Sequence, residues 1–305
     1  MTLFLKQNAM MKKLKLIVNP IAGGGYALKI LPRVIGILEQ RGCEVDVFKT
    51  STRGDAQRAA AELPRDCSAV AAMGGDGTIN EVVHGLLNSG RDIPVGLIPL
   101  GTANVLAREL RVPFDYVQAC YVIAGGNTRR IDVGRDESKY FVLMAGVGFD
   151  AEVVRIIASN RMGGISALTY AIPILKAFWN YDYPRFSVEV DGRPLGEGAG
   201  SVFISNTRRY TGPMVITNRA KVDDGELDVF IFRDSGKMKL LKYAMGAIFW
   251  VADSFYDTTY VRGKEVVVKP AGKKKQITYQ IDGDLAGKLP QKFTVVPAAL
   301  SVLVP

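Results

Sequence analysis

The chain has 305 residues, of which 48% are hydrophobic and 23% are charged, a composition typical of folded proteins and, at this length, of two domains. Its three cysteines, Cys43, Cys67 and Cys120, form no CxxC pair, and His84 is the single histidine. This disfavours a disulfide framework, a zinc site and a Ser-His or Cys-His relay. The formal net charge of +9 indicates an acidic partner, for which nucleic acid, anionic lipid and nucleotide all qualify.

The chain has no run of 18 apolar residues, and residues 1–11 lack the features of a secretory signal. We therefore predict a soluble, cytoplasmic protein whose folded part begins near Lys12, with the true start at Met1 or at Met10 or Met11.

The first half of the chain alternates apolar strand-like runs with segments of helical periodicity. Strands are predicted at residues 14–18, 44–48, 67–73 and 95–99, and helices at residues 28–40, 54–63, 79–88 and through Leu110. Such alternation is typical of an α/β domain with a parallel sheet, which binds ligands beyond the carboxyl ends of its strands.

The most informative segment is the turn Gly74-Gly-Asp-Gly-Thr78, which lies between a predicted strand and a predicted helix. Its glycines let the backbone approach a ligand, and the helix start supplies N–H groups and a positive dipole end for a phosphate. Asp76 would repel polyphosphate unless a divalent cation or a hydroxyl donor lies between them. A plain βα turn with Asp76 as a helix cap is the alternative interpretation.

After about Asp132, short β-rich segments and Asp-Gly turns dominate, which predicts an antiparallel β-sandwich. We place the domains at residues 12–133 and 134–305. The strands are predicted at residues 140–144, 185–190, 201–205, 227–233, 265–269, 276–281 and 293–303, with helices at residues 166–179 and 237–255.

Taken in order, five segments resemble the diacylglycerol-kinase catalytic domain family, which includes bacterial lipid kinases and sphingosine and ceramide kinases. They are Asn19-Pro20 with its glycines, Gly74 to Thr78, Pro99-Leu-Gly-Thr-Ala-Asn104, Asp223 to Asp228, and Ile281-Asp-Gly-Asp284. The resemblance covers nearly the whole chain from Lys12. The glycine turn alone is shared with NAD kinases, whereas the other segments favour lipid kinases.

The resemblance implies that ATP lies between the two domains, with Mg²⁺. The residues implied to bind nucleotide are Asn19, Thr50, Gly74, Gly75, Asp76, Gly77, Thr78, Asn80, Glu81, Gly101 and Thr102. The implied magnesium ligands are Asp224, Glu226 and the carbonyl of Lys221. Asp284 matches the general base, although many relatives have Glu there, and Val105 stands where many have Asp.

These features predict an ATP-dependent lipid kinase, in which Asp76 links Mg²⁺ to the phosphates and Asp284 accepts the proton of a lipid hydroxyl. Diacylglycerol, phosphatidylglycerol and sphingoid acceptors stay open. Two alternatives are an NAD kinase and a basic nucleotide-binding protein without catalysis. A nucleic-acid partner is not expected, because acidic residues lie beside the glycine turns and no aromatic-basic interleaving is present.

A lipid kinase must reach a membrane, and the second domain contains candidate contacts for an anionic bilayer. Lys237, Lys239 and Lys242 precede the apolar patch at residues 244–250, which suits an interfacial helix but equally a core helix. Further positive charge is supplied by Arg208, Arg209, Arg219, Lys221 and residues 273–275. We expect peripheral membrane contact, and the sequence leaves both a monomer and a homodimer open.

Overall fold

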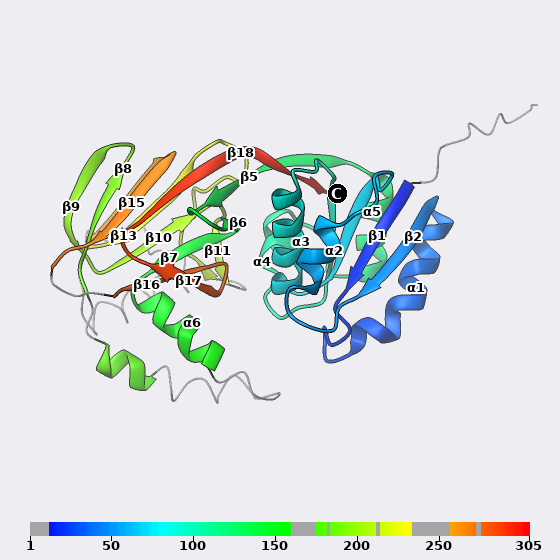
Figure 1. Cartoon of the computed structure of the whole chain (residues 1–305), viewed down its shortest axis with the longest axis horizontal. Helices are drawn as coiled ribbons and strands as arrows, with labels where there is room; N and C mark the ends of the chain where they lie inside the picture. The colour runs from blue at the N-terminus through cyan, green and yellow to red at the C-terminus, as the bar shows by residue number, and fades with distance from the viewer. Residues whose placement is uncertain (1–11, 160–174, 182–183, 212–213, 234–256, 273–275) are drawn as a thin grey trace, which may run out of the picture. The chain divides into compact units, whose positions relative to one another are not determined.

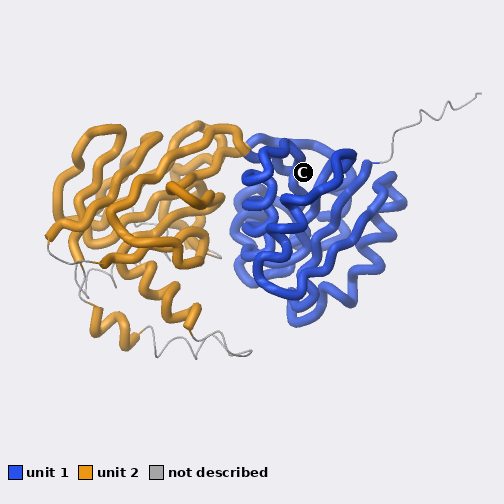
Figure 2. The backbone as a smooth tube through the Cα atoms, viewed as in Figure 1, with its two compact units in different colours: residues 1–130, 300–305 blue, residues 131–299 orange. Residues whose placement is uncertain are grey.

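The computed structural model describes residues 12–159, 175–181, 184–211, 214–233, 257–272 and 276–305. The chain forms two compact units (Figure 2). Unit 1 comprises Met1–Arg130 and Leu300–Pro305, and unit 2 comprises Ile131–Ala299. The chain passes between the units within two strands, β5 (Thr128–Arg135) and β18 (Gln291–Leu303).

Unit 1 contains a parallel sheet with strand order β2-β1-β3-β4, extended by the end of β18 (Figure 1). Apart from β18, its strands are β1 (Lys12–Val18), β2 (Cys43–Lys49), β3 (Ala69–Gly74) and β4 (Val95–Pro99). Every residue of β3 and β4 is buried, as expected of central parallel strands covered on both faces. These strands match the predicted ones to within one or two residues at each end.

Helices cover both faces of the unit 1 sheet. Leu14, Leu16 and Val18 share one core with residues of α1 and α5, and Figure 1 shows α2 and α3 on the other side of β1 from α1. The helices are α1 (Tyr26–Gln40), α2 (Asp55–Ala61), α3 (Asp76–Ser89), α4 (Val105–Glu109) and α5 (Tyr116–Gly125). The predicted α/β domain with a parallel sheet is therefore confirmed.

Unit 2 consists mainly of antiparallel strands around a core that includes Phe141, Phe186, Val229 and Phe293. One sheet has the order β14-β13-β10-β7-β16-β17, with β14 (Thr258–Gly263), β13 (Leu227–Phe232), β10 (Ser201–Ser205), β7 (Met144–Val147), β16 (Thr278–Ile281) and β17 (Asp284–Lys288). The other strands are β15 (Glu265–Pro270), β8 (Phe186–Val190) and β9 (Arg193–Ala199), which follow β18 in order, and β6 (Tyr140–Phe141), which pairs with β5. The short pair β11 (Arg209–Thr211) and β12 (Met214–Val215) stands apart. The predicted β-sandwich-like second domain is confirmed.

Several elements differ from the sequence predictions. Helices α5 and α6 (Phe149–Ser159) were not predicted. The end of β18 belongs to unit 1, because Val302 pairs in parallel with Val95 of β4, whereas the predicted second domain extended through residue 305.

Two predicted helices fall wholly or partly outside the described residues. Residues 175–179 of the predicted helix at 166–179 are helical, and residues 166–174 lie outside the described ranges. The predicted helix at 237–255, with its three lysines and the patch at 244–250, lies entirely outside them, as do the lysines at 273–275. None of the described helices combines the length and apolarity needed to cross a bilayer.

Two glycines within helices of unit 1 allow a matched test of the packing between α2 and α3. A Cβ on Gly85 would lie 2.2 Å from the carbonyl oxygen of Gln57, whereas a Cβ on Gly36 of α1 would meet nothing within 4 Å. Gly85→Ala should lower the free energy of unfolding by about 1–3 kcal/mol through overpacking. Gly36→Ala should raise it by up to about 1 kcal/mol, because it restricts the unfolded chain.

Urea unfolding followed by circular dichroism measures both changes. Equal and small changes in the two variants would contradict the close approach of α3 to α2.

Candidate functional site

The order of the unit 1 strands defines where a ligand can enter. From β1 the chain returns through α1 to β2 on one side, and from β3 it returns through α3 to β4 on the other side. The loops after β1 and β3 therefore diverge, which opens a crevice at the carboxyl ends of these adjacent strands. Asn19 follows β1, and the glycine turn follows β3.

Hydrogen bonds join the loops around this switch point. The Asn19 backbone N–H donates to the Met73 carbonyl (2.9 Å), and its Nδ2 donates to Thr78 Oγ1 (3.3 Å). The Leu100 N–H donates to the Gly74 carbonyl (2.8 Å), and the Thr50 N–H donates to the Val18 carbonyl (2.9 Å). The segments that contain the predicted nucleotide residues after β1, β2, β3 and β4 are thus connected to neighbouring strand ends.

Close contacts leave no room for a side chain at Gly74 and Gly101, whereas a Cβ on Gly77 would meet nothing within 4 Å. A Cβ on Gly74 would lie 2.5 Å from Thr78 Oγ1, and a Cβ on Gly101 would lie 2.6 Å from the Cα of Gly75. Asn104 holds Gly101 through two hydrogen bonds, in which its Oδ1 accepts from the Gly101 N–H (2.8 Å) and its Nδ2 donates to the Gly101 carbonyl (2.7 Å). The backbones after β3 and β4 therefore touch directly, while Thr102 is exposed beside them.

Helices α1 and α3 begin beside the switch point without a side-chain cap. Their N-cap residues are Gly25 and Gly75, and neither makes a side-chain cap hydrogen bond. The first N–H groups of a helix lack partners within the helix and carry the positive end of its dipole, so they attract anions. Gly77 and Asn80 lie in the first turns of α3, Gly77 exposed and Asn80 half-buried.

Two acidic residues predicted to bind nucleotide contact the starts of other helices. Asp76 Oδ1 accepts a hydrogen bond from the Val105 N–H at the start of α4 (2.6 Å). Burial raises the pKa of Asp76, and hydrogen bonds from backbone N–H groups oppose that rise. Glu81 accepts from the Gly54 N–H (2.9 Å) and the Ala56 N–H (3.2 Å) at the start of α2. Each carboxylate thus has a helix N-terminus as its partner.

Asp55 holds the loop after Thr50, and the sequence analysis did not identify it. Its carboxylate accepts from the backbone N–H groups of Ser51 (2.8 Å) and Thr52 (2.9 Å) and from both hydroxyl groups. These hydrogen bonds hold the pKa of Asp55 well below its usual range. The spacing Thr52-Arg-Gly-Asp55, which resembles a capping box, was the available signal.

In unit 2, the predicted base lies beside a tight hairpin turn. Asp282 and Gly283 both have positive φ, 47° and 84°, as a type I′ turn requires, and half-buried Asp284 begins β17. The Asp282 carboxylate accepts from the backbone N–H groups of Val142 (2.8 Å), Leu143 (3.0 Å) and Met144 (2.8 Å). Asp282 therefore fixes the turn, and Asp284 is the carboxylate that follows it.

The predicted magnesium ligands lie on another turn of unit 2. Asp224 Oδ2 and Glu226 Oε2 each lie 3.2 Å from Nη1 of Arg262, so both carboxylates face one cation. Asp132 fixes this turn by accepting from the Gly225 N–H (2.7 Å). Within the described ranges, no cluster of three or more His, Cys, Asp or Glu side chains could hold a metal. Two carboxylates and the Lys221 carbonyl are nevertheless hard oxygen ligands that fit Mg²⁺.

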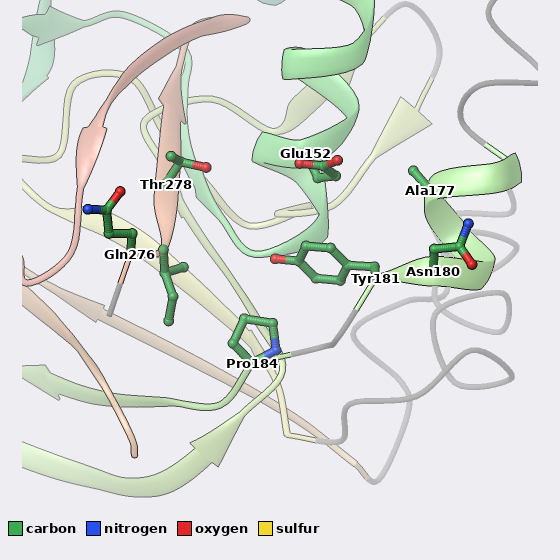
Figure 3. A pocket seen from close by; sticks show the side chains of 8 residues that line it. Glu152, Ala177, Asn180, Tyr181, Pro184, Gln276 and Thr278 are labelled. Carbon is green, nitrogen blue, oxygen red and sulfur yellow. The ribbon is translucent and has the colours of Figure 1, made fainter. Parts of the chain in front are cut away.

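Unit 2 also contains a cavity of about 410 Å³ between α6, residues 177–181, Pro184 and β16 (Figure 3). Glu152, Asn180, Gln276 and Thr278 give it polar groups, and the ring of Tyr181 extends into it. Its other lining residues are Ala177, Pro184 and Ile277. This mixture suits a ligand that has both hydroxyl groups and hydrocarbon.

Residues 13–135 match the model of the diacylglycerol kinase catalytic domain, and residues 144–304 match that of the YegS C-terminal NAD kinase beta sandwich-like domain. The chain is 29% identical to a diacylglycerol kinase of Bacillus subtilis, with 97% of each chain covered. It is 31% identical to a diacylglycerol kinase of Mycobacterium tuberculosis, over 96% of this chain and 95% of the relative. A crystal structure of a diacylglycerol kinase from Bacillus anthracis has the same fold, with a TM-score of 0.76 and 21% identity over 96% of this chain and 97% of that one.

An α/β domain with a glycine turn at its switch point, followed by an antiparallel β-sandwich-like domain, defines a class of two-domain kinase folds. Together with the matches across both units, it shows that the chain belongs to the diacylglycerol kinase catalytic domain family, a family of lipid kinases. The resemblance inferred from the sequence is thereby confirmed.

Proposed function

We propose that this chain transfers the γ-phosphoryl group of ATP to the hydroxyl group of a lipid. Relatives that span nearly the whole chain are named diacylglycerol kinases, which favours a diacylglycerol-type acceptor over phosphatidylglycerol or a sphingoid base. The acceptor hydroxyl would form a new P–O bond at the γ-phosphorus as the bond to the β-phosphate oxygen breaks and ADP leaves.

The start of helices α1 and α3 beside the switch point is the observation that carries the proposal. Where Glu81 and Asp76 accept from the N-termini of α2 and α4, the N-termini of α1 and α3 have glycine N-caps and no side-chain cap. Phosphate groups of ATP would accept hydrogen bonds at the start of α3. At the start of α1 they would face the positive end of the helix dipole, because the N–H groups of Tyr26 and Ala27 already donate to the carbonyls of Gly23 and Ala22. The surface that contacts the phosphates would be formed around them by Asn19, Thr78, Gly74, Gly75 and Gly101.

Asp284 would act as the general base. A lipid hydroxyl is a weak nucleophile at neutral pH, and a carboxylate within hydrogen-bond reach can accept its proton as the new P–O bond forms. The Asp282 carboxylate binds backbone N–H groups and so fixes the Asp282-Gly283 turn, which holds the backbone of Asp284 in place. Positioning of this kind contributes much of the rate in phosphoryl transfer, which needs little covalent help.

Asp224, Glu226 and the carbonyl of Lys221 would hold Mg²⁺ in unit 2, and Asp76 would face Mg²⁺ at the phosphates. When bound at phosphates, this ion neutralises the charge that develops during transfer. In unit 2, the convergence of Asp224 and Glu226 on Arg262 supports the assignment, because the guanidinium group stands in for a cation.

The cavity beside β16 would receive the polar end of the lipid. Hydroxyl and amide groups of Thr278, Asn180 and Gln276 can hydrogen-bond a glycerol group, while Ile277 and Pro184 can contact the first part of an acyl chain. The cavity lies at the start of β16 and Asp284 follows its end, since Thr278 pairs with Lys288 and Ile281 pairs with Asp284. The reacting hydroxyl would therefore have to extend along the strand from the cavity to the base.

A transfer assay tests the proposed activity. Purified protein with γ-labelled ATP and Mg²⁺ should label diacylglycerol in mixed micelles and leave NAD unlabelled. Asp284→Asn should lower kcat by about 10²–10⁴-fold, the usual contribution of a general base, while ATP binding measured by calorimetry is retained.

Glu197→Gln is the matched control, because it makes the same change from carboxylate to amide at an exposed position of β9 in unit 2. Labelling of NAD in place of lipid would favour the NAD kinase alternative. Nucleotide binding with no acceptor labelled would favour a binding protein without catalysis.

A thermal-shift measurement tests the cation site without relying on activity. Excess Mg²⁺ should raise the Tm of the wild-type protein by about 2–4 °C relative to EDTA. Asp224→Asn should remove this shift, because the ion loses a charged ligand. Asp223→Asn, which changes the neighbouring carboxylate, should retain it. Equal shifts in both variants would place the ion elsewhere.

A substitution that fills the cavity tests the acceptor site. Ala177→Trp should raise the KM for the lipid at least tenfold and leave the KM for MgATP within twofold, because the indole occupies the cavity of about 410 Å³. Lys176→Trp places the same side chain at the exposed neighbouring position and should leave both constants unchanged. A lipid KM that is the same in both variants would remove the cavity from the acceptor site.

A further inference from the structure

A buried amide–carboxylate pair lies directly behind the turn that precedes Asp284. Gln280 of β16 has one oxygen and one amide nitrogen to place, and both are used. Its Oε1 accepts from the backbone N–H of Gly283 (2.8 Å), and its Nε2 donates to Asp150 Oδ2 (2.8 Å). Gln280 and Asp150 are 2% and 5% exposed, so water does not compete for these bonds.

Hydrogen-bonding chemistry determines the orientation of the Gln280 amide. A backbone N–H can only donate, so the oxygen of Gln280 must face Gly283 and the nitrogen must face Asp150. Asp150 then has to accept from Gln280, and its other oxygen, Oδ1, accepts from the hydroxyl group of Tyr210. If the Gln280 amide turned its oxygen toward residue 150, its nitrogen would face Gly283, and the Gly283 N–H would lose its acceptor.

The contact between Asp150 and Gln280 fills the space next to Gly146, which leaves no room for a side chain at that position. Gly146 of β7 lies opposite Gln280 in the antiparallel ladder. A Cβ on Gly146 would lie 1.8 Å from Asp150 Oδ2 and 2.7 Å from Gln280 Nε2. Glycine at this position therefore allows Asp150, in the first turn of α6, to reach Gln280 across β7.

The turn before Asp284 is thus held at two points. The Asp282 carboxylate binds backbone N–H groups of residues 142–144, and Gln280 binds the N–H of Gly283. We infer that Asp150 and Gln280 are positioning residues that set the direction of the Asp284 carboxylate through the Gly283 backbone. The inference rests on the proposed role of Asp284 as general base. Neither residue needs to touch the substrate, ATP or the reacting atoms.

A double substitution that exchanges the two chemical groups tests the inference. In Asp150→Asn with Gln280→Glu, the amide of residue 150 donates to residue 280, whose other oxygen still accepts from Gly283. The hydroxyl of Tyr210 still has an oxygen to donate to, and the net charge is unchanged. Both hydrogen bonds are restored with the direction of one reversed.

The single variants break this arrangement. In Gln280→Glu, the new carboxylate lies against the carboxylate of Asp150. In Asp150→Asn, residue 150 can donate as well as accept, so the Gln280 nitrogen is no longer held toward it. We expect kcat to fall at least tenfold in Gln280→Glu and at least threefold in Asp150→Asn, with the KM for MgATP within twofold of wild type. The double variant should return kcat to within threefold of wild type.

Gly146→Ala should reproduce the loss of kcat without changing either side chain, and Lys269→Gln, at an exposed position of β15, should leave kcat unchanged. The inference would be overturned if kcat of the double variant were no higher than kcat of the less active single variant. It would also be overturned by a fall in kcat that simply follows the Tm across the set.

Hydrogen exchange at the Gly283 amide separates this inference from the proposed function. Exchange should be at least tenfold faster in Gln280→Leu and Gln280→Glu, and should return to the wild-type rate in the double variant. If Asp284→Asn kept its activity and this exchange pattern were still observed, Asp284 would not be the base, but the coupling through Gln280 would stand. Unchanged exchange in Gln280→Leu would reject the coupling itself, whatever the activity.

Discussion

The hydrogen bond from the Asn19 backbone N–H to the Met73 carbonyl joins the ends of β1 and β3 where the connections of the sheet diverge. The arrangement around the candidate nucleotide site depends on this junction. It continues the β1–β3 pairing for one step beyond the strands, so the loop after β1 and the glycine turn begin from a fixed separation. The bond from Leu100 to Gly74 does the same between β3 and β4, and the Gly75–Gly101 contact follows from it. A side chain at Gly75 or Gly101 would push these two backbone segments apart.

Carboxylates in both units are matched to backbone N–H groups. Glu81 and Asp76 accept from the starts of α2 and α4, Asp55 accepts from the loop after β2, and Asp282 accepts from residues 142–144. A carboxylate that accepts several N–H bonds fixes a loop more firmly than side-chain packing at the surface does. In unit 1 the glycine-capped N-terminus of α1 has no acidic residue in its first turn, whereas α3 begins with Asp76, whose carboxylate accepts from the start of α4. Negative charge beside a phosphate site is therefore compatible with anion binding.

The sequence predicted most of the fold because the apolar periodicity is strong in the buried strands and amphipathic helices. It failed where other constraints determine the backbone. Residues 140–144 read as one strand, but Asp282 accepts the N–H groups of residues 142–144, so the segment divides between β6 and β7. Helix α6 follows a glycine-rich stretch that concealed its start, and β9 contains Pro194, Gly196 and Gly198.

The candidate site was predicted from motifs, and its supporting contacts were not. The glycines, Asn19 and Thr78 belong to short segments whose chemistry is local. The partners of Asp76, Glu81 and Gln280 lie far along the chain, at Val105, Gly54 and Asp150, and a single sequence contains no signal for such pairs. For the same reason, the Arg262 contact of Asp224 and Glu226 could not be anticipated.

Strand β18 returns to unit 1 after all of unit 2, and its Val302 pairs beside Val95 of β4. During synthesis on the ribosome, the edge of β4 therefore emerges long before the segment that covers it. Until then, the incomplete sheet exposes the unpaired N–H and C=O groups of β4, an apolar strand that is buried in the folded protein. Such an edge can pair wrongly with another nascent chain. Unit 1 expressed alone as residues 12–130 would retain that open edge permanently, and so would be prone to self-association.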